Sequence, residues 1–329
     1  MGALTWLLIF ALAIFIAAAL ALLGAAARAR ADGEAAEASC PPLGAFLTIE
    51  TPGGPIPLHY VERGPTEGAE AGARAPILMI HGLGGTLRHF TATILDDLAR
   101  DHRAIAVDRP GAGYSGRAPH GSAHLEDQAA ALGRLLDGLG ALRPLVIGHS
   151  LGGAVALALA LQRPVAGLLL LSPATHPFRN KPPTPDQTVD SPFARRLIAR
   201  TYGPRVTAQS RPQILSIIFG PQSPPHDYAT RAGGALTIRP GQLEAAMEDG
   251  ALLRPDLAAQ SAEYGEIDAP ITILFGDADR LLDPGDHIPP LRAKAPQTEA
   301  RILQGIGHMT PFAARDAVLE AARALTAKV

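Results

Sequence analysis

The sequence has almost no cysteine and no concentration of positive charge, and each lack excludes a class of protein. Cys40 is the single cysteine among 329 residues, which excludes an intrachain disulfide and any metal site built from cysteines. Glu37 stands where a bacterial lipobox has an aliphatic residue, so we interpret Cys40 as an inert thiol rather than a site of lipid attachment. The formal net charge is -2 and no basic stripe is visible, so nucleic acid is not an expected partner.

Charged side chains are also missing from the start of the chain, before Arg28. Residues 3–27 are apolar almost throughout, and at about 1.5 Å per helical residue this run can cross the ~30 Å hydrocarbon core of a bilayer. It lacks the basic n-region of a signal peptide and exceeds the usual apolar core of roughly 7–15 residues. We therefore predict that residues 1–40 are an uncleaved single-pass anchor and a tether rich in alanine and glutamate. A cleaved signal peptide and secretion are the alternative, since Ala-Arg-Ala occurs twice before Asp32.

The charges that follow the apolar run do not settle which side of the membrane the rest of the chain faces. Arg28 and Arg30 flank the run at its C-terminal end, which by the positive-inside tendency places the remainder in the cytoplasm. Asp32, Glu34 and Glu37 follow at once, and only two residues precede the run. The sequence leaves the orientation open.

Beyond Pro42, short apolar bursts alternate with segments of helical periodicity such as residues 90–100 and 125–140. This alternation predicts an α/β fold with right-handed crossovers and a mostly parallel sheet covered by helices on both faces. A hairpin is expected to open it, because Thr-Pro-Gly-Gly-Pro separates the first two bursts. The expected strands are residues 46–50, 58–62, 77–81, 104–108, 145–149, 168–172, 271–275 and 300–303.

A long interval separates the sixth and seventh expected strands. A structureless loop of nearly a hundred residues is improbable in a compact domain, and apolar clusters at 195–203, 213–220 and 242–260 indicate helices instead. We predict a helical cap at residues 176–265, inserted into an α/β core made of residues 41–175 and 266–329.

A serine between glycines marks the candidate active site. Gly148 and Gly152 flank Ser150 in a G-x-S-x-G pattern between an expected strand and an expected helix, where small residues permit a sharp turn that exposes the hydroxyl. The helix that follows offers free backbone N–H groups and a positive dipole end, both favourable to an oxyanion. Ordinary βα turns also use glycine and serine, so the motif alone does not decide.

The remaining groups that an activated serine needs follow in the expected order. A serine hydroxyl requires a base, and the base requires an orienting acid. Asp277, Asp279 and Asp283 come just after the strand at 271–275, and His308 comes just after the strand at 300–303. Both groups therefore belong to the same C-terminal sheet edge as Ser150, where open α/β sheets carry their sites.

Five stretches together give the chain a family resemblance from about Pro41 to its end. It resembles the α/β-hydrolase superfamily, in the cap-bearing branch of esterases, C–C bond hydrolases and cofactor-free haloperoxidases. The stretches are HGLGG (81–85), DRPGAGYSG (108–116), GHSLGG (148–153), FGDADRLLDP (275–284) and GIGHM (305–309).

The resemblance implies roles for individual residues. Ser150 is the implied nucleophile and His308 the implied base. Asp279 is the implied acid, because the family's acid precedes arginine, two hydrophobic residues and then a proline; Asp277 is its main rival. The implied oxyanion donors are two backbone N–H groups, that of Leu151 directly after the nucleophile and that of Leu83 in the first βα loop.

Three other residues near these motifs are interpreted as structural. His81 is expected to bond neighbouring loops, His149 to flank the serine turn, and Asp108 to brace the loop that it opens. Residues 111–116 read G-x-G-x-x-G, the dinucleotide fingerprint, but no helix opens directly after them. We therefore expect no nicotinamide or flavin cofactor.

The expected reaction is acyl transfer to water. A serine at the turn argues against haloalkane dehalogenases and related epoxide hydrolases, which the resemblance associates with an aspartate at this position. The chain is predicted to cleave a carboxylic ester of a small, apolar molecule through an acyl-enzyme, without metal or cofactor. Perhydrolysis and C–C cleavage would use the same triad, and a non-catalytic binding protein of the same fold is the remaining alternative. The lipid bilayer is the expected partner of the N-terminal helix.

Overall fold

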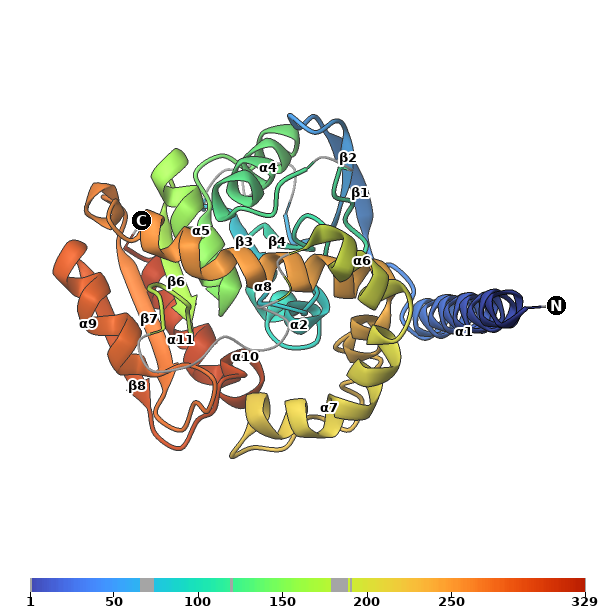
Figure 1. The fold of residues 1–329 in the computed structure, drawn as a ribbon. Coiled ribbons are helices and arrows are strands. Elements are labelled where there is room, and N and C mark those ends of the chain that lie inside the picture. Colours follow the sequence, from blue (N-terminus) through green and yellow to red (C-terminus); the bar gives the residue numbers. More distant parts are fainter. Residues whose placement is uncertain (1, 66–73, 119–120, 179–188, 190, 329) are drawn as a thin grey trace.

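One sheet of eight strands organises the chain, in the order β1-β2-β4-β3-β5-β6-β7-β8 (Figure 1). This arrangement comes from a computed structural model, which describes residues 2–65, 74–118, 121–178, 189 and 191–328. β1 pairs with β2 and β2 with β4 in antiparallel fashion, and the remaining pairs are parallel. The strands are β1 (Ala45–Ile49), β2 (Ile56–Arg63), β3 (Ile77–Ile80), β4 (Ala104–Val107), β5 (Leu145–His149), β6 (Gly167–Leu171), β7 (Ile271–Gly276) and β8 (Thr298–Leu303).

All eight strands lie where apolar bursts predict them, and the mostly parallel α/β sheet is confirmed. Successive strand residues point to opposite faces, so the continuous apolar runs supply two cores. In β3, Leu78 and Ile80 join one core while Ile77 and Met79 join the other. The first core also receives side chains from α4, α5, α8 and α9, and the second from α2, α3 and α11.

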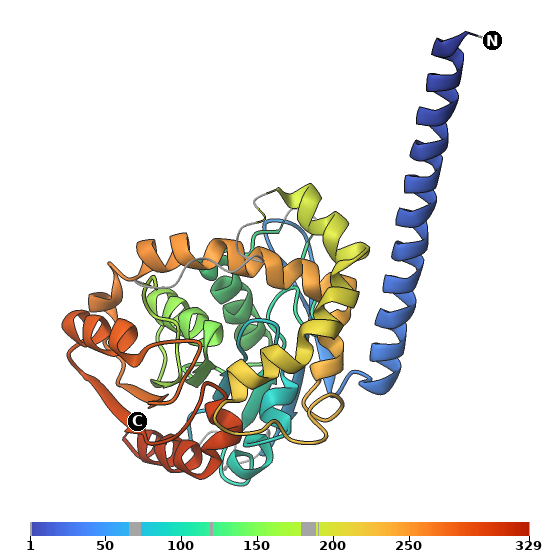
Figure 2. The same ribbon diagram turned by 60° about the horizontal axis from the view of Figure 1, so that its bottom comes forward.

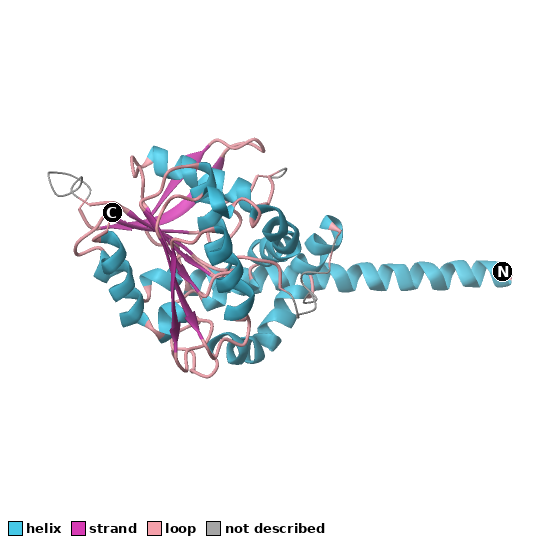
Figure 3. Cartoon of the chain, turned by 90° about the vertical axis from the view of Figure 1, so that its left-hand side faces the viewer, coloured by secondary structure: helices cyan, strands magenta, loops and turns pink. Residues whose placement is uncertain are grey.

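The helices cover both faces of the sheet, as Figure 3 shows. The predicted helix at 90–100 is in fact two short helices, because β-branched residues fill the join and Thr93 Oγ1 donates to the carbonyl of His89 at 2.6 Å. The helices and 3₁₀ turns are α1 (Ala3–Ser39), α2 (Arg88–Thr91), α3 (Leu95–Leu98), α4 (Leu125–Gly138), α5 (Leu151–Gln162), α6 (Pro192–Arg200), α7 (Gly203–Phe219), η2 (Gly234–Ile238), α8 (Pro240–Gln260), η3 (Tyr264–Glu266), α9 (Pro284–Lys294), α10 (Thr310–Ala313) and α11 (Arg315–Thr326).

The elements from α6 to η3 lie between β6 and β7, and we call residues 191–266 the helical insertion. Parts of the predicted cap, residues 179–188 and 190, lie outside the described residues. The insertion crosses the body above the sheet in Figure 2. A buried ion pair fastens it to the core: Arg109 Nη1 lies 2.6 Å from Asp249 Oδ2 in α8, and both side chains are 1% exposed. Arg117 Nη2 contacts the other oxygen of Asp249, also at 2.6 Å.

The N-terminal helix α1 is longer than the sequence predicts. Residues 28–39, expected to be a tether, continue the helix to Ser39 without a break. Small residues explain the difference: Ala29, Gly33 and Ala36 recur on one face and are buried against the insertion. A Cβ on Gly33 would lie 3.1 Å from the ring of Pro240, so glycine permits this close approach. The apolar N-terminal part of α1 projects away from the body (Figures 2 and 3).

Cys40 lies at the C-terminal end of the contact between α1 and the insertion. Its side chain is fully buried, and its Sγ lies 3.4 Å from the backbone oxygens of Ala229 and Thr230. Just before it, Glu37 pairs with Arg239 at 2.6 Å. The thiol therefore acts as a packing group between α1 and the insertion.

Candidate active site

Ser150 sits at a sharp corner between β5 and α5. Its backbone has φ 55° and ψ −121°, a region that non-glycine residues enter at a cost of about 1–3 kcal/mol. Strand β6 and the loop after it hold it there: the Ser150 N–H donates to the Leu171 carbonyl at 3.0 Å, and the Ala174 N–H donates to the Ser150 carbonyl at 3.1 Å. These two hydrogen bonds hold the strained corner in place.

Three glycines make this corner possible. A Cβ on Gly148 would lie 2.5 Å from the Gly152 carbonyl oxygen, and one on Gly152 would lie 2.1 Å from that of Ile80. A Cβ on Gly82, in the loop after β3, would lie 2.9 Å from Ser150 Cβ. No side chain fits at any of these positions without moving backbone or the serine itself. The glycine spacing of the motif is thus a packing requirement.

Asp279 and His308 meet at the ends of β7 and β8. His308 Nδ1 lies 2.8 Å from Asp279 Oδ2, and the two side chains are 3% and 0% exposed. The second carboxylate oxygen of Asp279 accepts the N–H groups of Leu281 and Leu282 at 2.8 and 2.9 Å. These two bonds orient the carboxylate, and the carboxylate in turn fixes the imidazole with Nε2 as its free nitrogen.

The two rival carboxylates have other contacts. Asp277 Oδ1 accepts the Gly305 N–H at 2.6 Å and braces the turn after β8. Asp283 is the N-cap of α9 and accepts the Gly285 N–H at 2.8 Å. Of the three aspartates in this segment, Asp279 is the one that contacts His308.

The two implied oxyanion donors belong to segments next to Ser150. Leu151 is the first residue of α5, where a backbone N–H has no partner within the helix. Leu83 follows Gly82 in the loop whose backbone approaches Ser150. The positive end of the α5 dipole points at the same place, so a developing negative charge beside Ser150 is favoured there.

The histidines beside the serine have the structural contacts that the sequence analysis expects. His81 Nε2 accepts the Arg109 N–H at 3.1 Å, and its Nδ1 lies 2.8 Å from the Gly82 carbonyl. His149 Nε2 lies 3.0 Å from the His308 carbonyl oxygen and donates to it. Burial lowers the pKa of both imidazoles well below the usual value; the charge of Arg109 adds to the effect at His81, and the neighbouring imidazole of His308 adds to it at His149. Both histidines are neutral at physiological pH.

Asp108 braces its loop in the way that the sequence analysis expects. Its Oδ2 contacts His59 Nδ1 at 2.7 Å and accepts the Tyr114 N–H at 2.9 Å. Its Oδ1 accepts the Leu87 N–H at 2.7 Å. The carboxylate therefore ties β2 and two loops together, at some distance along the chain from the triad candidates.

The structure adds a residue that sequence reasoning missed. Gln222, in the insertion, holds the loop that carries His308 from both sides: its Oε1 accepts the Gly307 N–H at 3.0 Å and its Nε2 donates to the Gly305 carbonyl at 2.6 Å. A lone glutamine in a loop after α7 carries no motif, so no sequence signal could have found it.

Known proteins resemble this chain in sequence and in fold. A family profile described as the alpha/beta hydrolase fold matches residues 75–313. RutD of Variovorax paradoxus (strain S110), by name a carbamate hydrolase, is 30% identical over 229 residues, which cover 69% of this chain and 80% of that protein.

Two solved structures share the fold at lower identity. A thermophilic esterase from Thermogutta terrifontis is 22% identical, with a TM-score of 0.65, over 86% of this chain and all of that one. A membrane phospholipase A, described as a bacterial virulence factor, is 21% identical with a TM-score of 0.65, over 97% of this chain and 99% of that one. At 97% coverage, most of α1 falls inside the second match.

Proposed function

The chain belongs to the α/β-hydrolase family and is a hydrolytic enzyme, and on that premise we propose that it cleaves carboxylic esters with Ser150 as nucleophile. The observation that carries this proposal is the juxtaposition at one sheet edge of a strained serine corner and a buried Asp279–His308 pair. A serine with such a base and acid is the arrangement that acyl transfer requires.

The proposed reaction proceeds in two halves. His308 Nε2 takes the proton of the Ser150 hydroxyl as the oxygen attacks the ester carbonyl, and Asp279 stabilises the resulting imidazolium. The backbone N–H groups of Leu83 and Leu151 stabilise the oxyanion, each donor contributing about 3–4 kcal/mol. The alcohol leaves with the proton from His308, and water activated by the same imidazole then releases the acid and restores the serine.

We propose that the helical insertion is a cap over this site and that α1 is a retained single-pass membrane anchor. Support for the anchor comes from the packing of α1: its apolar N-terminal part has a mean hydropathy of 2.9 over an entirely exposed window, while Ala29, Gly33 and Ala36 are buried against the insertion. Cleavage after Ala31 would strip part of that packing surface from the body. A site held beside a bilayer suits an apolar or lipid-like ester, and the membrane phospholipase A with the matching fold points the same way.

Labelling with a fluorophosphonate probe tests the nucleophile. The full chain in detergent should react, and Ser150→Ala should not, while Ser115→Ala, at a buried serine of the Asp108 loop, should react normally. A folded wild type that fails to react at several pH values would overturn the proposal in favour of a binding protein. A labelled enzyme that hydrolyses no ester of any chain length would redirect it to C–C cleavage or perhydrolysis.

Extraction of membranes tests the anchor separately. The full chain should stay in the pellet after an alkaline carbonate wash, and deletion of residues 3–23 should release an active protein. Mass determination of the protein recovered from membranes should give the uncleaved chain. Release of the full chain by the wash, or a mass that begins after Ala31, would contradict the anchor and leave the hydrolase proposal untouched.

A further inference from the structure

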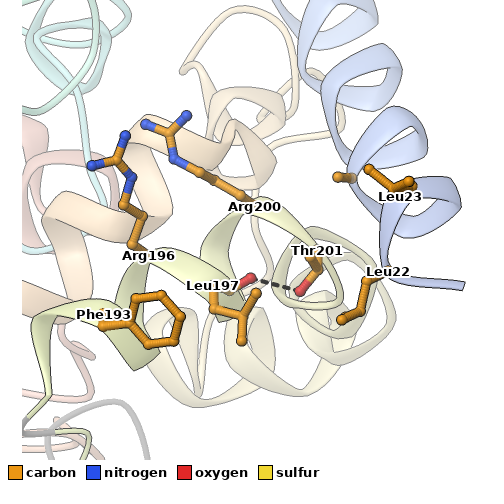
Figure 4. Close-up of a pocket in the computed structure, with 8 residues that line it drawn as sticks. Leu22, Leu23, Phe193, Arg196, Leu197, Arg200 and Thr201 are labelled. Atoms are coloured by element: carbon orange, nitrogen blue, oxygen red, sulfur yellow. Dashed lines mark hydrogen bonds between the residues drawn. The ribbon is translucent and has the colours of Figure 1, made fainter. Parts of the chain in front are cut away.

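An open apolar groove lies where α1 meets the insertion. Its volume is ≈ 320 Å³, and it runs between one face of α1 and one face of α6 (Figure 4). The lining residues are Leu22, Leu23, Ala26, Phe193, Arg196, Leu197, Arg200 and Thr201. The catalytic candidates are not among them, so the groove is separate from the site described above.

The α6 side of the groove is an exposed stripe. Phe193, Arg196, Leu197 and Arg200 follow one another at helical spacing, so they share one face, and Phe193 is 75% exposed. The opposite face of α6 packs through Ala199, which is fully buried. An exposed phenylalanine and leucine beside two arginines is unusual for a surface in water, where large contiguous apolar patches mark interaction sites.

The position of the groove along α1 matches the edge of a bilayer. Residues 3–23 precede the part of α1 that the body partly covers, which begins at Gly24, and these 21 residues span about 31 Å as a helix. That is the thickness of the hydrocarbon core. Leu22 and Leu23 therefore lie where hydrocarbon gives way to headgroups, and α6 lies beside them.

The surface around α1 also becomes more charged from the apolar groove towards the C-terminal end of the helix. A second groove of ≈ 450 Å³ continues the first, sharing Ala26 and Arg200 with it, and is lined by charged residues including Arg30, Glu34 and Arg239. Residues 192–219, which form α6 and α7, contain five arginines and no aspartate or glutamate, although the whole chain has a net charge of -2. Apolar, cationic and then mixed polar surfaces follow one another as acyl chain, phosphate and water do in a lipid leaflet.

We propose that α6 lies in the headgroup layer of the bilayer and that the groove holds an anionic phospholipid of that leaflet. An acyl chain packs against Leu22, Leu23, Phe193 and Leu197, and the phosphate binds the guanidinium groups of Arg196 and Arg200. Arg200 also contacts Glu244 through Nε, at 3.3 Å, which leaves its terminal nitrogens for the phosphate. This inference rests on the proposed anchor; it makes the insertion a second, peripheral contact with the membrane.

A single-tryptophan reporter tests the proposal. Trp6 is the chain's one tryptophan, so Trp6→Phe with Phe193→Trp places the only reporter in the groove. The full chain is reconstituted into phosphatidylcholine–phosphatidylglycerol vesicles in which one lipid carries brominated acyl chains, which quench nearby tryptophan. The matched control is Trp6→Phe with Ile302→Trp, because Ile302 is exposed on β8, which lies on the far side of the body from α1 (Figure 1). Fluorophosphonate labelling verifies that both variants are folded.

The expected result is quenching in the Phe193→Trp protein and none in the Ile302→Trp protein. Arg196→Gln in the reporter should lower the preference for brominated phosphatidylglycerol over phosphatidylcholine by about fivefold, the worth of one arginine at a membrane surface. Arg301→Gln, on β8, should leave that preference unchanged.

Three outcomes would overturn the proposal, and they differ from a failure of the anchor. Full emission from the Phe193→Trp protein, when that protein resists the alkaline wash, would show an anchored chain whose α6 stays out of the bilayer. Emission that shifts with the protein-to-lipid ratio, without quenching, would show that a second copy covers the groove. Equal quenching by both lipids in the Arg196→Gln and parent reporters would refute a site for an anionic headgroup at Arg196 and Arg200. Protein lost from the vesicles altogether would refute the anchor itself.

Discussion

His308 Nδ1 and Asp279 Oδ2 lie 2.8 Å apart inside the protein, while Asp277, two residues earlier, bonds a backbone N–H of the neighbouring turn instead. The two aspartates are close in sequence and equal in charge, so they form a matched pair of variants. Only one of them can hold the imidazole in the tautomer that leaves Nε2 free to accept a proton.

Asp279→Asn should therefore lower kcat for a p-nitrophenyl ester by about 10⁴-fold, the loss seen when the acid of a serine triad becomes an amide. Asp277→Asn should keep most of the activity, because its carboxylate braces only the turn at Gly305. Steady-state kinetics with both purified variants measure the difference. Equal losses in the two variants would rule out a specific role for Asp279.

Gly82→Ala should remove activity without unfolding the protein. The new Cβ would lie 2.9 Å from Ser150 Cβ and 3.3 Å from His149 Nδ1, so the loop that carries the Leu83 N–H must move. Loss of one oxyanion donor lowers kcat by about 10²–10³-fold. Gly241→Ala is the control, since no atom lies within 4 Å of its added Cβ. Wild-type kcat in a folded Gly82→Ala protein would contradict the assigned donor.

Asp249→Asn should destabilise the whole chain. The substitution leaves the guanidinium of Arg109, which is 1% exposed, without its counterion, and breaking a buried pair in this way costs about 3–5 kcal/mol. Glu320→Gln, which breaks an exposed pair with Arg301, should cost less than about 1 kcal/mol. Urea unfolding of both variants in detergent gives the two values. An Asp249→Asn protein as stable as Glu320→Gln would show that the insertion is not fastened through this pair.

His287 should make the protein sensitive to acid. Burial lowers its pKa from 6.5 to about 4, and its Nδ1 accepts the Thr175 N–H at 3.2 Å, which only an unprotonated nitrogen can do. The folded state thus binds the proton less tightly than the unfolded state. The stabilisation is complete above pH 6.5 and is lost as the pH falls towards 4, by about 3 kcal/mol in total.

His287→Gln retains an acceptor that does not titrate, so its free energy of unfolding should fall by about 3 kcal/mol less than that of the wild type between about pH 7 and about pH 4. Other buried histidines titrate in both proteins and cancel in the difference. His226→Gln, at an exposed position, should reproduce the wild-type profile. Parallel profiles for the wild type and His287→Gln would contradict the prediction.

The sequence predicts the strands well because a parallel sheet buried on both faces demands apolar side chains at nearly every position. β3, with Ile77 to Ile80 all buried, is an example. Chain order then brings Ser150, Asp279 and His308 to one sheet edge without any knowledge of distances. These are the features that local composition and topology determine.

Contacts between distant segments could not be predicted. An alanine- and glutamate-rich stretch has the composition of a tether, and the packing of Gly33 depends on Arg239 and Pro240, which lie across from it. Gln222 and Asp249 belong to no motif in the sequence, and each contributes to the structure through a contact with a residue in another element. Side-chain pairs of this kind leave no periodicity or motif.

The packing of α1 on residues far along the chain has a consequence for biosynthesis. Glu37 and Arg239, which join the two parts, are 202 positions apart, and at about 5–20 residues per second a ribosome needs about 10–40 s to cover that interval. On the proposed anchoring, α1 enters the membrane early and keeps Ala29, Gly33 and Ala36 uncovered until the insertion has been synthesised. The contact between α1 and the body therefore forms late in translation, and under the proposed anchoring the body takes up its orientation to the membrane only when its last third has folded.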